Sequence, residues 1–115
     1  MTANSSFRAL IEKHCVTIRE MFEEFRRLYG ARAMGQPPGS EAMVTLHTLK
    51  GSCGTIGFQD LYAHVAKLHE HLKAWPAETT AQHGFEREIA QEIDQTAQLV
   101  DAIKPEDSSL YGRVL

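Results

Sequence analysis

The sequence predicts an all-α fold, an antiparallel up-down four-helix bundle, and three observations support this prediction. Apolar residues recur in four stripes at steps of three and four, which is the period of a one-sided helix. Glycine and proline residues separate the stripes. No run of β-branched residues alternates with polar ones, so nothing favours a strand. Four one-sided helices with short connections can bury their stripes only against each other.

The first two helices are predicted from the N-terminal half of the chain. The first stripe predicts a long helix through Phe7, Leu10, Ile11, Cys15, Ile18, Phe22, Phe25, Leu28 and Tyr29. Glycines and prolines between Gly30 and Gly39 predict a loop, because both residues oppose continued helix. Ser40 is expected to cap a second helix that ends between Gly51 and Gly57. Its apolar residues are Met43, Leu46, Leu49 and Cys53.

Two further stripes predict the remaining helices. The third helix stops before Pro76, since a residue before proline is pushed out of the α region, and the fourth stops before Pro105. The third stripe comprises Phe58, Leu61, Val65, Leu68 and Leu72, and the fourth comprises Phe85, Ile89, Ile93, Ala97, Val100 and Ile103. The tail from Glu106 to Leu115 is expected either to fray or to fold back as a short cap, for instance as a short extra terminal helix.

Length and composition exclude several classes of protein. A chain of 115 residues suits a single domain spanning residues 1–115. The formal net charge of −3, with no Lys/Arg-rich run, argues against nucleic acid as a partner. No apolar stretch is long enough for a membrane span and no signal peptide is evident, so we expect a cytoplasmic protein that does not bind membranes. We also expect a monomer. Cys15 and Cys53 fall in apolar patterns and are expected to be buried, reduced thiols.

The second helix carries an unusual outward stripe: Val44, His47, Lys50, Gly51 and Gly54. Each interior glycine costs a helix up to about 1 kcal/mol relative to alanine, so two on one exposed face suggest that something approaches closely. An exposed neutral imidazole is a competent nucleophile near neutral pH, and a phosphoryl group on it would lie beside the Lys50 ammonium. By spacing alone, an ordinary surface histidine before helix-ending glycines explains the same residues.

The string from His47 to Leu61, HTLKGSCGTIGFQDL, resembles the signature of the histidine-containing phosphotransfer (HPt) family. The shared pattern is H-x-L-K-G, two small residues, a hydrophobic-Gly pair and a Leu four residues later. The resemblance implies that His47 accepts a phosphoryl group from a receiver-domain aspartate and passes it to another receiver. It implies that Lys50 stabilises the phosphoryl group and that Gly51 gives the receiver clearance.

The same resemblance implies the partners, which are response-regulator receiver domains and a sensor or hybrid histidine kinase. The chain then needs no cofactor or metal of its own, and the receiver supplies a bound Mg²⁺. The docking surface is expected to include Met43, Val44, Gly54 and Phe58, with Leu10 and Ile11 from the first helix. For each apolar residue in this set the alternative is ordinary core packing.

One position departs from the family pattern. Where the family often has Glu or Gln on the third helix, this chain has His69, one residue after the apolar position matched by Leu68. By resemblance His69 lies next to His47, where a hydrogen bond would fix the tautomer of the acceptor ring and introduce pH dependence. The alternative is a plain surface histidine.

Other classes of function are less well supported. His64, His69, His71 and Glu70 do not share the helix face that a metal site requires. No nucleotide-binding motif is present, so the phosphohistidine carrier that the resemblance implies is expected to lack kinase activity of its own. A module that docks or sequesters receivers without carrying phosphate remains an alternative. A purely structural bundle would explain the stripes but not the glycines around an exposed histidine.

Overall fold

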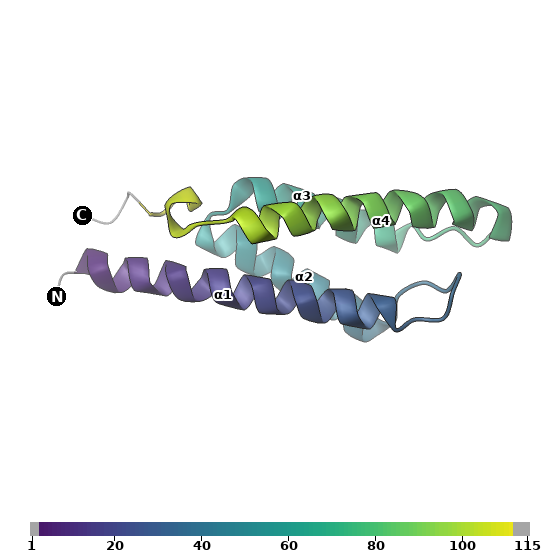
Figure 1. Cartoon of the computed structure of the whole chain (residues 1–115), viewed down its shortest axis with the longest axis horizontal. Coiled ribbons are helices and arrows are strands. Elements are labelled where there is room, and N and C mark those ends of the chain that lie inside the picture. Colours follow the sequence, from purple (N-terminus) through teal and green to yellow (C-terminus); the bar gives the residue numbers. More distant parts are fainter. Residues whose placement is uncertain (1–2, 112–115) are drawn as a thin grey trace.

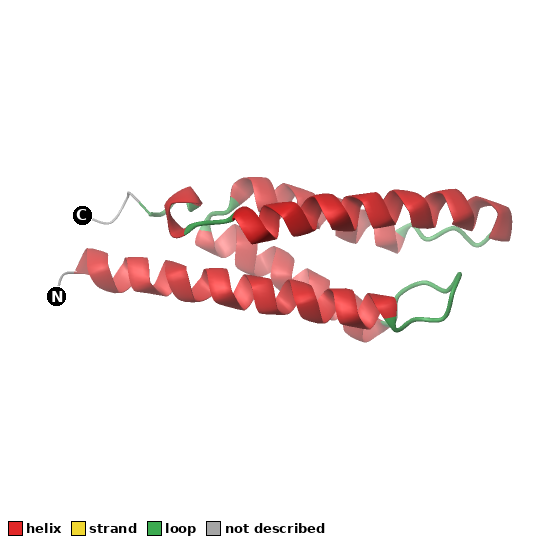
Figure 2. Cartoon of the chain, in the orientation of Figure 1, coloured by secondary structure: helices red, strands yellow, loops and turns green. Residues whose placement is uncertain are grey.

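The computed structural model describes residues 3–111, with the side chains of residues 8–78 and 81–111. Its helices are α1 (Ala3–Gly30), α2 (Ser40–Ile56), α3 (Gln59–Lys73) and α4 (Thr79–Ala102), followed by the short 3₁₀ helix η1 (Pro105–Asp107). The helices run up and down along a rod of 58 × 20 × 18 Å (Figure 1). No strand occurs among the described residues (Figure 2), and the predicted antiparallel four-helix bundle is confirmed.

The core lies along the axis of the bundle and is formed by the predicted stripes. Its fully buried members include Ile18 and Phe22 of α1, Leu46 and Leu49 of α2, and Leu68 of α3. Each helix packs against the next in the chain, and α1 also contacts α4. Cys15 and Cys53 are buried free thiols, as predicted. Burial raises the pKa of the Cys53 thiol to about 12, which keeps it protonated and unreactive. The side chain of Phe7, which was predicted in the first stripe, lies outside the described part of the structure. So do residues 112–115, which belong to the predicted tail.

The start of α2 differs from the prediction by one residue. Gly39, not Ser40, occupies the capping position, and its carbonyl accepts the first helical hydrogen bond from the Met43 amide at 3.1 Å. Ser40 already lies inside the helix, and no side chain caps this terminus. The prediction of a Ser40 cap is therefore wrong, because Gly39, directly before Ser40, adopts the extended conformation that the capping position requires.

The end of α2 is a tight, glycine-dependent corner. Gly57 has φ +88°, and its amide bonds the carbonyls of Cys53 and Gly54 at 3.1 and 3.3 Å. The Phe58 amide bonds the Cys53 carbonyl at 3.0 Å, which completes a Schellman motif. This corner turns the chain directly into α3, and it confirms the predicted end of the second helix.

The C-terminal segment, residues 105–111, folds back over this corner. The Ser108 hydroxyl donates a hydrogen bond to the Ile56 carbonyl, and the Ser109 amide donates to the Gly57 carbonyl at 2.9 Å. On the other side, the Arg19 guanidinium of α1 binds the Ile103 carbonyl at 2.7 Å. Of the two outcomes expected for the tail, fraying and a folded cap, the structure has the cap up to Tyr111.

The opposite end of the bundle is closed by an aromatic cluster. The Arg32 guanidinium lies 4.0 Å from the Tyr29 ring centroid and 5.3 Å from that of Trp75, and it approaches the Glu86 carboxylate at 4.0 Å. Trp75 meets Phe85 edge to face at 5.1 Å. Cation–π and edge-to-face contacts thus join the α1–α2 loop to the α3–α4 connection. None of the described helices is long and apolar enough to cross a membrane.

Candidate functional site

The centre of α2 presents His47 to solvent. The buried face of this helix consists of Ala42, Leu46, Leu49, Cys53 and Ile56, so the helical period turns His47 outward. Val44, one turn earlier, is 63% exposed, and Lys50, one turn later, is half-buried. The predicted exposure of His47 is confirmed, and its ring is free to meet a partner.

His69 of α3 lies directly beside His47. The two imidazole ring centroids are 5.5 Å apart with an angle of 44° between the planes. His69 is only 4% exposed, so the interpretation as a plain surface histidine is wrong. Its Nδ1 atom is buried and has no hydrogen-bond partner among the described residues. A buried polar atom without a partner is uncommon and calls for an explanation.

The surroundings of His69 favour its neutral form. Burial lowers the pKa of His69, because a desolvated imidazolium is unstable. The positive charges of Lys73 and Lys50 lower it further, as does His47, while Glu70 acts in the opposite direction. Two lysines from two helices therefore place positive charge around the pair of histidines. Such a site suits an anion.

Lys73 is the member of this group that the sequence reasoning missed. It lies four residues after His69 on α3, and that spacing places two side chains on one helix face. Its ammonium is 3.3 Å from the Glu70 carboxylate in an exposed pair. The spacing of four residues between His69 and Lys73 is visible in the sequence, but it indicates a role for Lys73 only once His69 is known to lie beside His47.

The two glycines of the outward stripe differ in their surroundings. A Cβ atom added at Gly51 would have no atom within 4 Å beyond its own helix. A Cβ at Gly54 would lie 3.2 Å from the ring of Tyr62, an α3 residue that is 40% exposed and that the sequence reasoning missed. The space above Gly54 is therefore filled from within the chain, whereas the space above Gly51 is open.

The predicted docking residues separate into exposed and buried ones. Val44 and Gly54 are exposed, Leu10 is 45% exposed, and Met43 packs partly against the core. Ile11 is 0% exposed, so its place in the docking surface is corrected: it faces the bundle core, as its position in the α1 stripe required.

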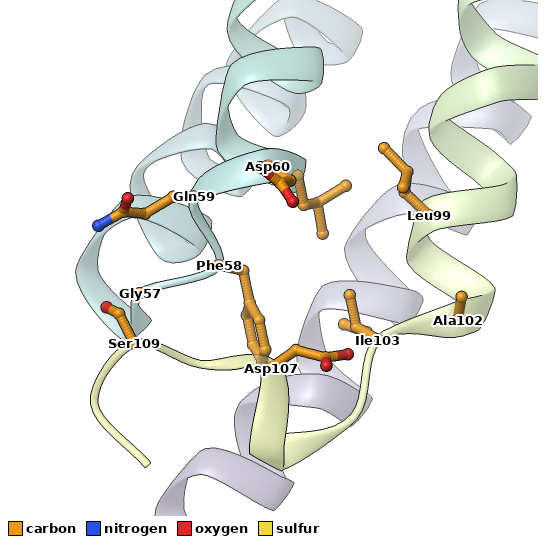
Figure 3. Close-up of a pocket in the computed structure, with 10 residues that line it drawn as sticks. Gly57, Phe58, Gln59, Asp60, Leu99, Ala102, Ile103, Asp107 and Ser109 are labelled. Atoms are coloured by element: carbon orange, nitrogen blue, oxygen red, sulfur yellow. The ribbon is translucent and has the colours of Figure 1, made fainter. Parts of the chain in front are cut away.

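Phe58 requires the same correction. It is 3% exposed, because its side chain turns toward Ile103 and the C-terminal segment (Figure 3). There it belongs to the wall of a concavity of about 450 Å³ between the start of α3, the end of α4 and the C-terminal segment. The side chain thus anchors the corner after α2 and is not available for direct contact with a partner.

A second concavity lies between α1 and α2, next to the exposed histidine. It has a volume of about 520 Å³. Its lining includes Val44 and Thr48, the latter adjacent to His47 in the sequence, and Met21 from α1. Its remaining lining residues are Thr17, Glu20, Glu24 and Thr45. This groove combines apolar and polar side chains, as transient protein interfaces do.

Metal binding finds no support in the described part of the chain. No three histidine, cysteine, aspartate or glutamate side chains there come together in a way that could hold a metal ion. His71, which the sequence reasoning considered together with His64 and His69, instead pairs through its Nδ1 atom with Glu92 of α4 at 2.5 Å.

Comparison with known proteins adds one finding. The chain matches the family model described as "Hpt domain" over residues 9–104, which includes all of α2 and α3. No curated protein and no solved structure matches the chain significantly.

Proposed function

The chain belongs to the Hpt domain family, whose members carry phosphoryl groups on histidine in two-component signalling, and on this premise we propose that His47 is the phosphoryl acceptor. The observation that supports this assignment best is the position of His47. It lies on the outer face of α2 beside half-buried Lys50 and the open space at Gly51. His64 and His83 are also exposed, but neither has this arrangement of a lysine and a glycine three and four residues later.

The proposed reaction is a reversible transfer between a receiver aspartate and His47. The lone pair of one ring nitrogen attacks phosphorus, an N–P bond forms, and the P–O bond to the aspartate breaks with its electron pair remaining on the carboxylate. The other ring nitrogen retains its proton. Donation to the next receiver is the reverse process on a second aspartate. Positioning and neutralisation of charge supply most of the catalysis in such transfers.

The two partners have different tasks in this proposal. Lys50 stabilises the phosphoryl oxygens through charge-assisted hydrogen bonds. The receiver contributes the carboxylate and a bound Mg²⁺, and this chain contributes no metal ion. Because family members are phosphocarrier modules and not kinases, the phosphoryl group originates from a histidine kinase through a receiver.

The receiver is expected to cover the face of α2 around His47. Exposed Val44 and the groove between α1 and α2 offer apolar surface directly beside the acceptor. Gly51 lets the backbone of the partner approach the imidazole, and Leu10 extends the surface along α1. We keep Val44, Gly51, Gly54 and Leu10 in this surface, with partly buried Met43 at its border.

The test is transfer from a phosphorylated receiver domain of the same organism. Wild type, His47→Gln and His83→Gln are incubated with the receiver, and acid-labile, alkali-stable phosphate is followed on each. His83→Gln is the matched control, because His83 is an exposed helical histidine on α4. We expect label on wild type and on His83→Gln, and none on His47→Gln.

Two results would contradict the proposal. Label that persists on His47→Gln would move the acceptor to another residue. If wild type bound receivers but never took label, the alternative function of a docking module that carries no phosphate would replace the carrier.

A further inference from the structure

His69 is the one histidine that is both buried and next to the proposed acceptor. It is 4% exposed, its ring centroid is 5.5 Å from that of His47, and its Nδ1 atom has no partner among the described residues. The charged or titratable groups that act on it are His47 and Lys50 of α2 together with Lys73 and Glu70 of its own helix. Positive charge therefore prevails around a side chain that can itself become positive.

Resting on the proposed function, we propose that His69 is a proton-linked positioning residue: it is neutral beside unmodified His47 and takes up a proton from solvent when His47 carries the phosphoryl group. No bond to phosphorus is made or broken by His69 in this role. It contributes a charge and a hydrogen-bond donor next to the loaded ring.

Two electrostatic effects of loading favour protonation of His69. A phosphoryl group brings nearly two negative charges near neutral pH, and negative charge favours the imidazolium form of His69. The same group neutralises Lys50, one of the charges that lower the pKa of His69 in the free chain. Loading therefore removes an obstacle to protonation and adds a force that favours it.

The hydrogen-bonding needs of the imidazolium also differ between the free and the loaded chain. A protonated imidazole has two N–H donors and no acceptor, so both nitrogens need acceptor partners. A phosphoryl group offers three strong acceptor oxygens. The Nδ1 atom is buried and has no acceptor among the described residues of the free chain, which disfavours the doubly protonated ring in that state.

Linkage makes this coupling reciprocal. If loading raises the pKa of His69, protonation of His69 must stabilise the loaded state by the same free energy. Loading of His47 thus becomes more favourable as the pH falls through the pKa that His69 has in the loaded chain. Each unit of difference between the two pKa values corresponds to about a tenfold change in the loading equilibrium. A glutamine at this position cannot contribute such a dependence.

The direct experiment is an NMR titration of the His69 ring in the full chain, before and after loading of His47 with phosphoramidate. The expected result is a titration at higher pH in the loaded chain. In parallel, the loading equilibrium with a phosphorylated receiver is measured between pH 8 and pH 6 for wild type and His69→Gln. We expect the loading equilibrium of wild type to increase by a larger factor than that of His69→Gln as the pH falls over this range.

A second pair of variants tests the electrostatics in the free chain. Lys50→Met removes a positive charge that acts on His69, and its ring should then titrate at higher pH. Lys67→Met removes an exposed lysine of α3 that is not among the groups acting on His69, and it should leave the titration unchanged. An unchanged titration of His69 in Lys50→Met would show that Lys50 does not act on His69, and the electrostatic part of the proposal would fail.

The outcomes separate this inference from the proposed function. If His47 is loaded but His69 titrates at the same or lower pH, or if wild type and His69→Gln show the same pH dependence, the inference is overturned and the carrier function stands. If phosphoramidate and phosphorylated receivers both fail to load His47, the carrier function fails and the inference fails with it.

Discussion

Two glycines in the same short string, Gly51 and Gly57, lack a side chain for different reasons. Gly57 has φ +88°, and a Cβ there would lie 3.0 Å from the Ser109 amide nitrogen and closer still to the Ser109 hydroxyl. Gly51 has ordinary helical geometry, and a Cβ there would meet nothing. The fold of the chain therefore requires Gly57 but gives no reason for Gly51.

The contrast separates residues that build the bundle from residues that serve a partner. Around Gly57 the C-terminal segment, the end of α2 and the start of α3 are tightly joined by hydrogen bonds. Around Gly51 the surface is open beside His47. Open space alone does not set Gly51 apart, because a Cβ at Gly84 of α4 would also meet nothing, but Gly51 lies one turn after exposed His47 on the same helix face. Substitutions around Gly57 should therefore lower the stability of the bundle, whereas substitutions around Gly51 should weaken transfer or docking without lowering stability.

The largest effect on stability is expected from Gly57→Ala. The left-handed conformation costs a non-glycine residue about 1–2 kcal/mol, and the contact with Ser109 adds to this, so we expect a loss of roughly 2–3 kcal/mol in the free energy of unfolding. Urea denaturation measures the loss. An unchanged unfolding midpoint would show that the corner relaxes easily and would remove the basis of the comparison.

The next effect concerns chemistry and not stability. Lys50→Met should lower the equilibrium loading of His47 by about 10- to 100-fold, because a charge-assisted hydrogen bond contributes about 1.5–3 kcal/mol. Its free energy of unfolding should change by less than about 0.5 kcal/mol, as is usual for surface substitutions. Lys67→Met is the matched control on α3 and should load like wild type. Equal loading of the Lys50→Met variant and wild type would exclude Lys50 from the site.

The smallest effect, and the most informative sign, is expected from Gly51→Ala. Alanine should raise the free energy of unfolding by up to about 1 kcal/mol through its higher helix propensity. The same change should weaken binding of a receiver domain, measured by titration calorimetry, because the methyl group occupies the clearance beside His47. A variant that is more stable and binds equally well would mean that the open space has no role in docking.

Much of the fold followed from local patterns in the sequence. The four stripes indicated the four helices because each has a single apolar face; glycines marked the ends of the first two helices and prolines those of the last two. The start of α2 was misplaced by one residue, because Gly39 and Ser40 are both acceptable caps and only the backbone path distinguishes them. The tail was ambiguous because its anchor, the carbonyl of Ile56, is distant in sequence.

The site was predicted less completely, for physical reasons. The outward stripe of α2 is a local property, so the exposure of His47 and the positions of its neighbours could be predicted. Three other features of the site depend on how α3 is rotated against α2. They are the burial of His69, the filling of the space over Gly54 by Tyr62, and the lowering of the His69 pKa by Lys73. Ile11 and Phe58 were misassigned because apolar residues near a site can face either core or partner, and only packing decides.

The most direct test of the account is to locate the phosphoryl group among the six histidines of the wild-type chain after transfer from a receiver. Peptide mapping by mass spectrometry under alkaline conditions preserves phosphohistidine and identifies the modified residue. The account predicts phosphate on His47 and on no other histidine. Phosphate on any other histidine, or a chain that binds receivers and remains unmodified, would contradict it.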